Sequence, residues 1–436
     1  MNYLRTVAAL SCFFIIAPSI RGEDAIDRLK LDRLRDQHTA IEALREQRHT
    51  SAVERPYQDF RANLHVHSDF SHDSRGKIEQ IVASAKAAGT QILMFTEHPA
   101  PHFDIFNDGH QGMRDGVLLI PGAEMNGFLV FPKQSPRDFA AAEKQEFSDI
   151  VCGRGGLTFI SHLEERMDWE INGVTGCEIY NTHADFKDEK RMLAALKNPL
   201  WLLQAKKMCD KYPQETLSAL LDYPSDYLER YDQLCQIQPH TGISANDAHQ
   251  NVGLIIRLSA GDKVAVEVPL GEKLLELDKA VFAAIQSIPD GTPIGSELFR
   301  MQLDPYENSL KHVGTHLLMK ELSVAAVWEA LNAGRAYVAF DWMADATGFD
   351  LALIENERRF EMGSQIAWQK GMALHAVAPH DVRWKVFRNG EVDFETNGDQ
   401  LSLDIERPGV YRVEAWLEVA GKEQIWILAN PVYIRN

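Results

Sequence analysis

Short apolar runs alternate with segments of helical pattern between residues 63 and 250. Within this region, KIEQIVASAKAAG (77–89) places its apolar side chains on one helix face, with Ser74 upstream as a possible N-cap and Gly89 as the stop. Strands that alternate with helices predict βαβ units, and therefore an α/β fold with a mainly parallel sheet or barrel. The first apolar run begins at residue 63. The runs that follow it are QILMFTEH (91–98), VLLIPGAE (117–124), LTFISH (157–162), GCEIYNTH (176–183) and GISANDAH (242–249).

The first 24 residues, MNYLRTVAALSCFFIIAPSIRGED, resemble a secretory signal. One arginine precedes an apolar run from Val7 to Ile16, and small residues follow. Cleavage near Ser19 or Gly22 is expected. Cys12 offers a lipoprotein alternative, but the apolar run continues past it. We therefore expect an exported protein, periplasmic or extracellular, without stable membrane insertion.

The regions outside the alternating pattern differ from it in texture. Residues 23–60 are charged and indicate a surface helix or spacer, and the stretch 185–234 is expected to be largely helical. Residues 336–436 alternate apolar and polar side chains between turns at 389–390, 397–398, 408–409 and 420–421, which predicts a small antiparallel β-sandwich. We divide the chain into a signal peptide (1–22), a helical spacer (23–60), a barrel with a connecting segment (61–335) and a C-terminal β-sandwich (336–436).

The formal net charge of −18 makes the surface strongly acidic. Such a surface repels phosphate backbones, so nucleic acid is excluded as an expected partner. A small-molecule substrate is expected instead, and it can be anionic because bound cations reverse the local field. The sequence carries no signal for an oligomeric state. The four cysteines beyond the signal are Cys152, Cys177, Cys209 and Cys235, and none forms a CxxC pair. One or two disulfides are possible in an oxidising compartment, but buried thiols are favoured.

The segment NLHVHSDFSHDS (63–74) concentrates metal-binding side chains at the end of one apolar run. The strand period of two places His65 and His67 on one side. Two imidazoles at a strand end commonly hold one metal ion, but HxH alone is a weak signal.

Repetition makes the signal stronger, because each of the other runs also finishes in a ligand-type residue. In a parallel barrel the carboxyl ends of all strands open on one face, so side chains far apart in sequence converge there. Any one of these residues could be an ordinary hydrogen-bonded side chain of the core or of a loop. Such roles do not account for ligand-type residues at the ends of six predicted strands. The ligand-type residues after the first run are Glu97, His98, Glu124, His162, Asn181, His183, Asp247 and His249.

The set contains histidines and carboxylates but no cysteine, which suits zinc, manganese or iron. Eight or more candidates are too many for one catalytic ion, which takes about three protein ligands and leaves a position open. We therefore expect two or three divalent metal ions that share a bridging carboxylate.

HVHSDFSHDS, FTEH, GAE, ISH and NDAH, in this order, resemble the polymerase and histidinol phosphatase (PHP) superfamily across residues 60–250. The resemblance implies a distorted seven-stranded (β/α) barrel, (β/α)7, with a two- or three-metal site. The later GRAYVAFDWMADATGFDL resembles a subgroup with a C-terminal β domain, which includes carbaryl-hydrolase-like metallohydrolases. FTEH and NDAH depart from the family's TDH and SDAH without removing a ligand.

Carried over residue by residue, the resemblance implies eight ligands, with Glu124 as the bridge. His183 falls where some members supply another ligand. Either His72 or Asp73 could reach the metal, and Asp73 is favoured. The eight implied ligands are His65, His67, Asp73, His98, Glu124, His162, Asp247 and His249.

A metal-dependent hydrolase follows as the expected function. A hydroxide between the ions would be the nucleophile, and His183, His102 or His110 would supply the leaving-group acid. Arg166 and Arg114 are weaker candidates for holding an anion. Phosphate esters suit this arrangement best, so an exported phosphoesterase is favoured.

Two alternatives stay open. One is a metallohydrolase of non-phosphate esters, carbamates or amides. The other is a non-catalytic surface or carbohydrate-binding protein, although tryptophans in alternating strands more often pack in a core and the ligand set is intact. The tryptophans that would stack sugars are Trp368, Trp384, Trp416 and Trp426.

Overall fold

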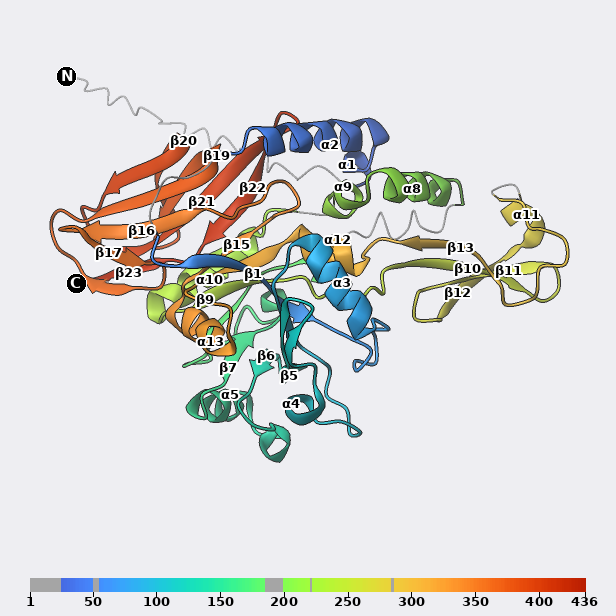
Figure 1. The fold of residues 1–436 in the computed structure, drawn as a ribbon, viewed down its shortest axis with the longest axis horizontal. Helices are drawn as coiled ribbons and strands as arrows, with labels where there is room; N and C mark the ends of the chain where they lie inside the picture. Colours follow the sequence, from blue (N-terminus) through green and yellow to red (C-terminus); the bar gives the residue numbers. More distant parts are fainter. Residues whose placement is uncertain (1–24, 50–54, 185–198, 220–221, 284–285) are drawn as a thin grey trace, which may run out of the picture.

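The computed structural model describes residues 25–49, 55–184, 199–219, 222–283 and 286–436. It contains a central α/β body, a large C-terminal sheet on one side and an elongated arm on the other (Figure 1). The expected signal peptide at residues 1–22 lies outside this range. Among the described residues, no helix is both long and apolar enough to cross a membrane.

The strands of the α/β body curve round one interior. One group is β1 (Gln58–Val66), β2 (Ile92–Phe95) and β4 (Val117–Ile120), with β3 (Gly112–Arg114) at its edge. Parallel bridges Val66–Ala248 and Glu97–Ala123 connect this group to a second sheet. Apart from β3 and β6 (Phe128–Phe131), the strands of these two sheets run parallel, so their carboxyl ends face one side. The second sheet, in spatial order, is β5 (Ala123–Met125), β6 (Phe128–Phe131), β7 (Leu157–Ile160), β8 (Gly176–Asn181) and β9 (Thr241–Ala245).

Two features of the body differ from the expectation. VLLIPGAE does not form one strand, because Pro121 and Gly122 separate β4 from β5. The antiparallel strand β6 was not expected; it forms a hairpin with β5 and separates β5 from β7. The mixed α/β character is as predicted.

Helix α3 (Ile78–Ala88) forms where the apolar spacing predicted it, and its end at Gly89 is left-handed with a φ of 76°. Lys77, not Ser74, is the N-cap residue. The Ser74 hydroxyl instead bonds the carbonyls of His67 and His249 and the Tyr306 hydroxyl, so tertiary contacts take the side chain away from the helix end.

The other helices lie around the body. The stretch expected to be helical from 185 to 234 is interrupted at Pro213 and Pro224, and its part 185–198 lies outside the described residues. The helices around the body are α1 (Ala25–Arg28), α2 (Leu31–Glu46), α4 (Ile105–Asp108), α5 (Lys144–Gly153), α8 (Pro199–Lys211), α9 (Pro213–Ser218) and α10 (Ser225–Ile237).

The segment 250–335 was expected to connect the two parts of the chain. It contains an elongated arm, followed by helices and a strand that pack on the α/β body. The arm is a four-stranded antiparallel sheet, with α11 (Lys279–Ala283) at its tip (Figure 1). The elements that follow the arm are α12 (Tyr306–His312), β14 (Gly314–Met319) and α13 (Val324–Ala333). The arm strands, in spatial order, are β12 (Lys273–Asp278), β11 (Lys263–Glu267), β10 (Gly253–Ser259) and β13 (Glu297–Gln302).

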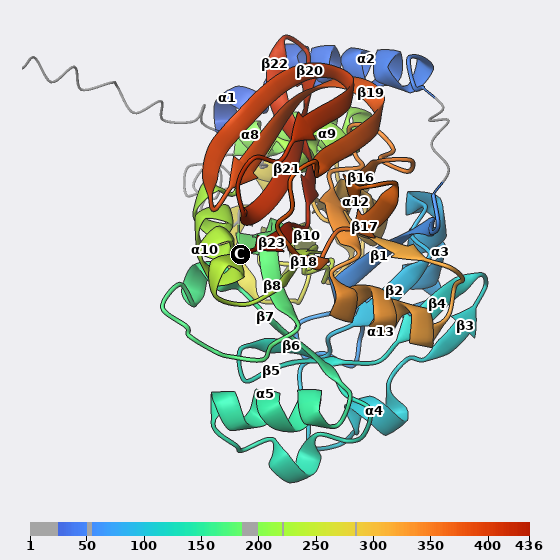
Figure 2. The ribbon, with the colours of Figure 1, turned by 90° about the vertical axis from the view of Figure 1, so that its left-hand side faces the viewer.

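One sheet continues from the body into the C-terminal strands. β14 pairs with β1, β15 (Ala336–Ala339) with β14, and β22 with β15, so the pairing crosses residue 336. Figure 2 shows the C-terminal strands and α2 above the body. The remaining C-terminal strands are β16 (Asp350–Glu355), β17 (Arg358–Glu361), β18 (Gln365–Ala367), β19 (Ala373–Arg388), β20 (Glu391–Asp404), β21 (Gly409–Val419), β22 (Lys422–Ala429) and β23 (Val432–Arg435).

Two of the predicted C-terminal turns are tight hairpins with left-handed residues, Asn389–Gly390 and Ala420–Gly421. Asn397–Gly398 is not a turn. It lies inside β20, opposite Arg383 and Val382 of β19, because both strands are long and their pairing continues beyond it.

A buried ionic network joins the body to the continuing sheet. His316 Nδ1 lies 2.7 Å from Asp59 Oδ1, and its Nε2 lies 3.0 Å from Asp341 Oδ2. Arg61 Nε lies 3.1 Å from Asp341, and the Tyr337 hydroxyl donates to Asp59. Burial opposes the charge on His316, but Asp341 and Asp59 outweigh it and raise the pKa of His316 to about 10. The ring is therefore an imidazolium at neutral pH.

The cysteines and the tryptophans proposed to stack sugars differ in burial, and Trp368 is the most exposed of these tryptophans at 36%. The four cysteines are free thiols; Cys177 and Cys235 are buried, as favoured, whereas Cys152 and Cys209 are partly exposed. Trp384 and Trp426 are fully buried in the core. Lys385 lies 3.8 Å from the centre of the Trp416 ring, and the indole of Trp368 donates to a backbone carbonyl.

Candidate metal centre

All eight predicted ligands lie together at the carboxyl ends of the strands. β1 carries His65, with His67 just beyond its end, and β5 carries Glu124. The other five lie in the segments that follow β1, β2, β7 and β9. The site is thus assembled from five chain segments that the curved sheets bring to one place: those with His65, His67 and Asp73, with His98, with Glu124, with His162, and with Asp247 and His249.

The first group of ligand atoms surrounds the end of β1. His65 Nε2 lies 3.4 Å from Glu124 Oε2 and 3.2 Å from Asp247 Oδ1. His67 Nε2 lies 3.5 Å from the same Asp247 oxygen and 3.0 Å from His65 Nε2. His162 Nε2 lies 3.2 Å from the other Glu124 oxygen. Three imidazole nitrogens, those of His65, His67 and His162, and two carboxylates thus lie around one small volume.

A second group adjoins the first. Asp73 Oδ2 lies 3.2 Å from His98 Nε2 and 3.3 Å from His249 Nε2. The His67 and His249 rings stack with centroids 3.9 Å apart. His67 belongs to both groups, which therefore lie side by side. Of the two neighbours that could reach the metal, Asp73 lies in the cluster, whereas the side chain of His72 is 79% exposed.

His183 belongs to a third group with Asp247 and His249. Its Nδ1 lies 3.1 Å from Asp247 Oδ2, the oxygen that does not face His65. Asp247 thus offers one oxygen to the first group and one to the third, as a bridging carboxylate would.

Both His162 and Asp247 have left-handed backbones, with φ of 43° and 50°. Left-handed conformations are costly for residues with a side chain and persist where the surroundings hold them. Here the backbone aims both side chains into the cluster.

The donor set fits divalent cations. Burial opposes the charge on Glu124, but His65 and His162 hold the pKa of its carboxyl well below its usual range. Burial and the charges of His249 and His65 lower the pKa of His67 to about 3, so this ring is neutral, as a ligand must be. Within the described residues, buried Asp73 Oδ1, Asp247 Oδ1 and His249 Nε2 have no hydrogen-bond partner. Cations would satisfy these atoms.

Glu178, which the sequence did not single out, lies behind the ligands. Its Oε1 lies 2.7 Å from His65 Nδ1, its Oε2 accepts from the His162 backbone at 2.7 Å, and its side chain is fully buried. A carboxylate that holds the far nitrogen of a ligand histidine orients the ring and raises its basicity. A charged residue inside the apolar run GCEIY was the signal for it.

Two more carboxylates, those of Glu97 and Glu164, contact the proposed ligands or the residues that hold them and are not themselves proposed as ligands. Glu97 accepts from the Ser68 and Ser71 hydroxyls, and Ser71 also bonds His67 Nδ1 and the His98 backbone. Glu164 lies 3.1 Å from His162 Nδ1 and accepts from the Tyr227 hydroxyl. Glu97 is the position where the sequence departs from TDH.

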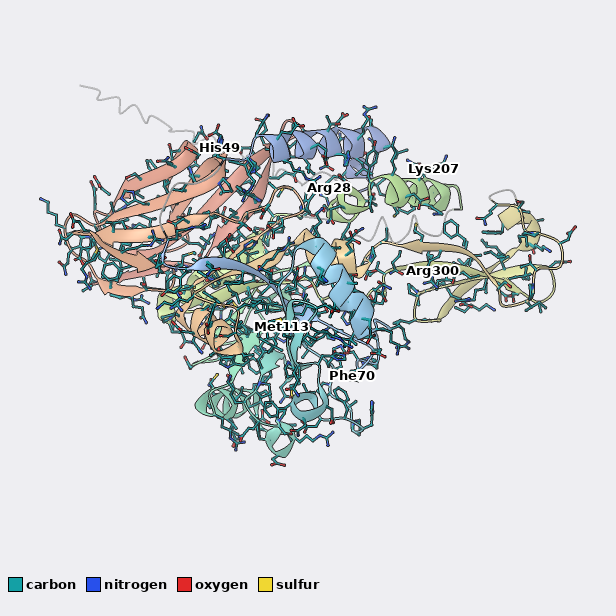
Figure 3. The ribbon with its side chains drawn as sticks, viewed as in Figure 1. Arg28, His49, Phe70, Met113, Lys207 and Arg300 are labelled. Carbon is teal, nitrogen blue, oxygen red and sulfur yellow. The ribbon has the colours of Figure 1, made fainter. Side chains whose placement is uncertain are left out.

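The other two proposed acids have different surroundings. His102 is exposed beside Phe103. His110 stacks on Phe70 at 4.6 Å and packs edge-on against Phe95 (Phe70 is labelled in Figure 3). Among the described residues, neither ring contacts the cluster, so they do not share the position of His183.

The two arginines proposed as anion holders have structural partners. Arg166 donates to the backbone carbonyls of Ser161 and His162, and Arg114 pairs with Glu79 on the surface.

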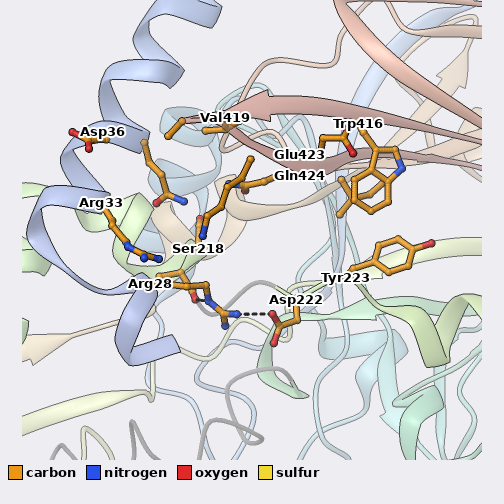
Figure 4. Close-up of a pocket in the computed structure, with 15 residues that line it drawn as sticks. Arg28, Arg33, Asp36, Ser218, Asp222, Tyr223, Trp416, Val419, Glu423 and Gln424 are labelled. Atoms are coloured by element: carbon orange, nitrogen blue, oxygen red, sulfur yellow. Dashed lines mark hydrogen bonds and ion pairs between the residues drawn. The ribbon is translucent and has the colours of Figure 1, made fainter. Parts of the chain in front are cut away.

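A cavity of about 480 Å³ lies away from this centre, between α1, α2 and the β21–β22 hairpin (Figure 4). Arg28 pairs with Asp222 across it at 2.7 Å, and the rings of Tyr223 and Trp416 lie 5.0 Å apart. Its lining includes none of the predicted ligands.

Comparison with known protein families agrees with the resemblance. Residues 63–250 match the PHP domain family. This part of the chain is a PHP domain, as predicted. A solved two-domain protein from Bacteroides vulgatus, described as containing a predicted PHP-like metal-dependent phosphoesterase, is 13% identical; the match covers 87% of this chain and 98% of that one, with a TM-score of 0.35. No curated protein matches the sequence.

Proposed function

We propose that the protein is a metal-dependent hydrolase with two or three divalent ions, and that phosphate esters are its substrates. The observation that carries the proposal is the sharing of Glu124 and Asp247 between histidines on different sides of the cluster. Two-metal hydrolases hold their ions about 3.5–4 Å apart, and carboxylates that lie within reach of several imidazoles could serve two such ions. Zinc, manganese and iron suit this set of ligands.

Ions held there would activate water and stabilise the negative charge that develops on a phosphoryl oxygen. The chain's own residues prepare this chemistry. Glu178 holds His65 in place, Glu164 holds His162, and the ionised Asp73 and Glu124 supply negative charge. His183 would protonate the leaving group, which its 22% exposure and its contact with Asp247 at the edge of the cluster support.

A second candidate is a metallohydrolase of non-phosphate esters, carbamates or amides. The observation that favours it is a groove of about 300 Å³ whose lining includes Pro99 and Met125, the residues next to His98 and Glu124. The lining also includes the apolar side chains of Ala100, Phe103 and Ile105. An apolar leaving group or acyl chain would find contact area there.

A carbohydrate-binding role has less support. Trp384 and Trp426 are fully buried, and Lys385 covers Trp416. Sugar stacking needs an open aromatic face.

The remaining predictions belong to the same proposal: export to the periplasm or medium, a closed (β/α)7 barrel and a C-terminal β-sandwich. The bridges Val66–Ala248 and Glu97–Ala123 support closure of the barrel. Fractionation of cells that express the full chain, with detection of a shortened protein outside the cytoplasm, tests export.

Hydrolysis of nitrophenyl phosphate, bis-nitrophenyl phosphate and nitrophenyl acetate by the purified protein tests the reaction. We expect turnover of a phosphate ester that is lost with chelator and in His67→Ala. Turnover of the acetate alone would replace the phosphoesterase with the second candidate. Retained metal and full activity in His67→Ala would contradict the ligand assignment.

A further inference from the structure

Two of the predicted ligands, Asp247 and His249, lie in a chain segment with a strained backbone. Asp247 and Gln250 are both left-handed, with φ of 50° and 56°. Such conformations are costly for residues with a side chain and persist where neighbouring groups hold them. The match to the PHP domain ends at residue 250, yet several of the groups that hold this segment come from residues 303–313, after the arm.

Asn246 is held by α12 and the residue after it, on the amino side of this segment. Its side chain is 2% exposed, and its amide nitrogen donates to the carbonyls of Ser309 at 2.8 Å and Val313 at 2.7 Å. Its oxygen accepts from the Asn63 amide at 2.7 Å. Asn246 is the position at which NDAH departs from SDAH. A serine hydroxyl has one donor and could not serve both carbonyls, so the asparagine suits the carbonyls presented here.

Asp304 holds the carboxyl side of the segment. Its Oδ2 accepts from the Asn251 N–H at 3.1 Å, and its Oδ1 accepts from the Val252 N–H at 2.9 Å. Gln302 Nε2 donates to the same Oδ1 at 2.6 Å and orients the carboxylate. One side chain from beyond the arm thus bonds both backbone N–H groups that follow the left-handed Gln250.

Tyr306 joins the segment to the end of β1. Its side chain is buried, and its hydroxyl donates to the His67 carbonyl at 2.7 Å and lies 3.3 Å from the His249 carbonyl and 2.8 Å from the Ser74 hydroxyl. A Cβ at Gly76 would lie 2.1 Å from this hydroxyl, so the ring fits only against a glycine. The His67 and His249 rings stack, and the hydroxyl bonds the backbone of both residues. The tyrosine therefore fixes the spacing of two proposed ligands.

We propose that Asn246, Asp304 and Tyr306 are positioning residues for the metal centre. They hold the backbone on both sides of the Asp247–His249 pair and at the end of β1. The PHP domain of residues 63–250 accordingly does not complete the centre without the segment that follows the arm. This inference rests on the proposed function, because it assigns these residues to the binding of its metal ions.

Hydrogen exchange of the metal-free full chain tests the positioning without any metal. The reporter is the amide of Ala248, which lies between the two ligands and donates to the His65 carbonyl at 3.2 Å. We expect Tyr306→Phe to speed its exchange about tenfold, because the backbone on either side is released. Asp304→Asn should have a similar effect, since the amide turns a donor toward a backbone N–H. It keeps the proposal testable if the tyrosine variant does not fold.

Tyr411→Phe is the matched control. The Tyr411 hydroxyl also donates to a backbone carbonyl, that of Arg407 at 2.8 Å, but it lies on β21 and contacts no proposed ligand among the described residues. Its loss should leave exchange at Ala248 unchanged. Unchanged exchange at Ala248 in both Tyr306→Phe and Asp304→Asn, or an equal increase in Tyr411→Phe, would overturn the proposal.

Titration with Co²⁺, followed by its absorption spectrum, tests the effect on the metal centre. We expect Tyr306→Phe and Asn246→Ser to weaken Co²⁺ binding about tenfold and to shift the absorption bands, whereas Tyr411→Phe does neither. A loss of stability alone would not move the bands. Wild-type affinity and spectrum in both variants would overturn the proposal. A wild type that binds no Co²⁺ would contradict the proposed function, and the exchange at Ala248 then shows separately whether these residues hold the segment.

Discussion

His65 Nδ1 lies 2.7 Å from Glu178 Oε1, with both side chains fully buried. This contact fixes the ring so that Nε2 faces Glu124 and Asp247. We predict that Glu178→Gln lowers metal affinity about 10- to 100-fold, because the amide supports the ring less strongly than a carboxylate. Competition with a chromogenic chelator measures the affinity. Glu170→Gln, at an exposed residue in the same region, is the control, and an equal loss there would contradict the role of Glu178.

The neighbours His72 and Asp73 should respond in opposite ways. Asp73 contacts His98 and His249, whereas the His72 side chain is 79% exposed. We predict that Asp73→Ala loses metal and lowers kcat/KM by at least about 100-fold, and that His72→Ala stays within about twofold of the wild type. Metal content and kinetics measured on both variants show which of the two residues binds the metal. The reverse order would mean that the loop holds the metal through His72.

The three candidate acids should also separate. His183 is bonded to Asp247, while His102 and His110 contact Phe103 and Phe70 instead. We predict a fall in kcat of about 10²–10⁴-fold for His183→Ala and little change for His102→Ala or His110→Ala. If His183 is an acid rather than a ligand, a substrate with a nitrophenolate leaving group should be affected least. A larger loss in His110→Ala would move the acid to the loop after β2.

The network around His316 predicts a pH-dependent stability. The pKa of His316 is about 10 in the folded protein and near 6.5 when unfolded, so its contribution is complete below pH 6.5 and is lost as the pH rises through 10. The groups facing the ring are Asp59, Asp341, Arg61 and Tyr337.

We therefore expect His316→Gln to lower the free energy of unfolding by roughly 3 kcal/mol at pH 6 and by less at pH 10. Denaturant unfolding at both pH values measures it, and His375→Gln, at an exposed position of β19, is the control. A difference that stayed constant with pH would show that the ring is not charged.

The sequence predicted that the eight proposed ligands lie together, because each lies at or after the end of a buried run whose strand pattern is strong. Parallel strands bring such ends together whatever the loops do. The break at Pro121, the hairpin strand β6 and the misassigned cap Ser74 depend on tertiary contacts that local patterns do not contain. Glu178 was missed for a related reason: its partners His65 and His162 lie 113 and 16 residues away.

The arm and the continuous sheet were beyond prediction as well. Residues 253–302 have ordinary strand patterns, but nothing local indicates that they pair only with one another. The pairing of β15 with β22 joins positions about 90 residues apart, as in Tyr337 with Ala429. Asn397–Gly398 has the composition of a turn, yet the long pairing with β19 keeps it extended.

The metal content of the purified full chain tests the central claim most directly. Elemental analysis of the wild type should find two or three equivalents of a divalent transition metal per chain, and Asp247→Ala, which removes the carboxylate shared between groups, should lose most of it. A wild-type protein that stays metal-free after incubation with zinc, manganese and iron, yet hydrolyses its substrate fully, would contradict the account.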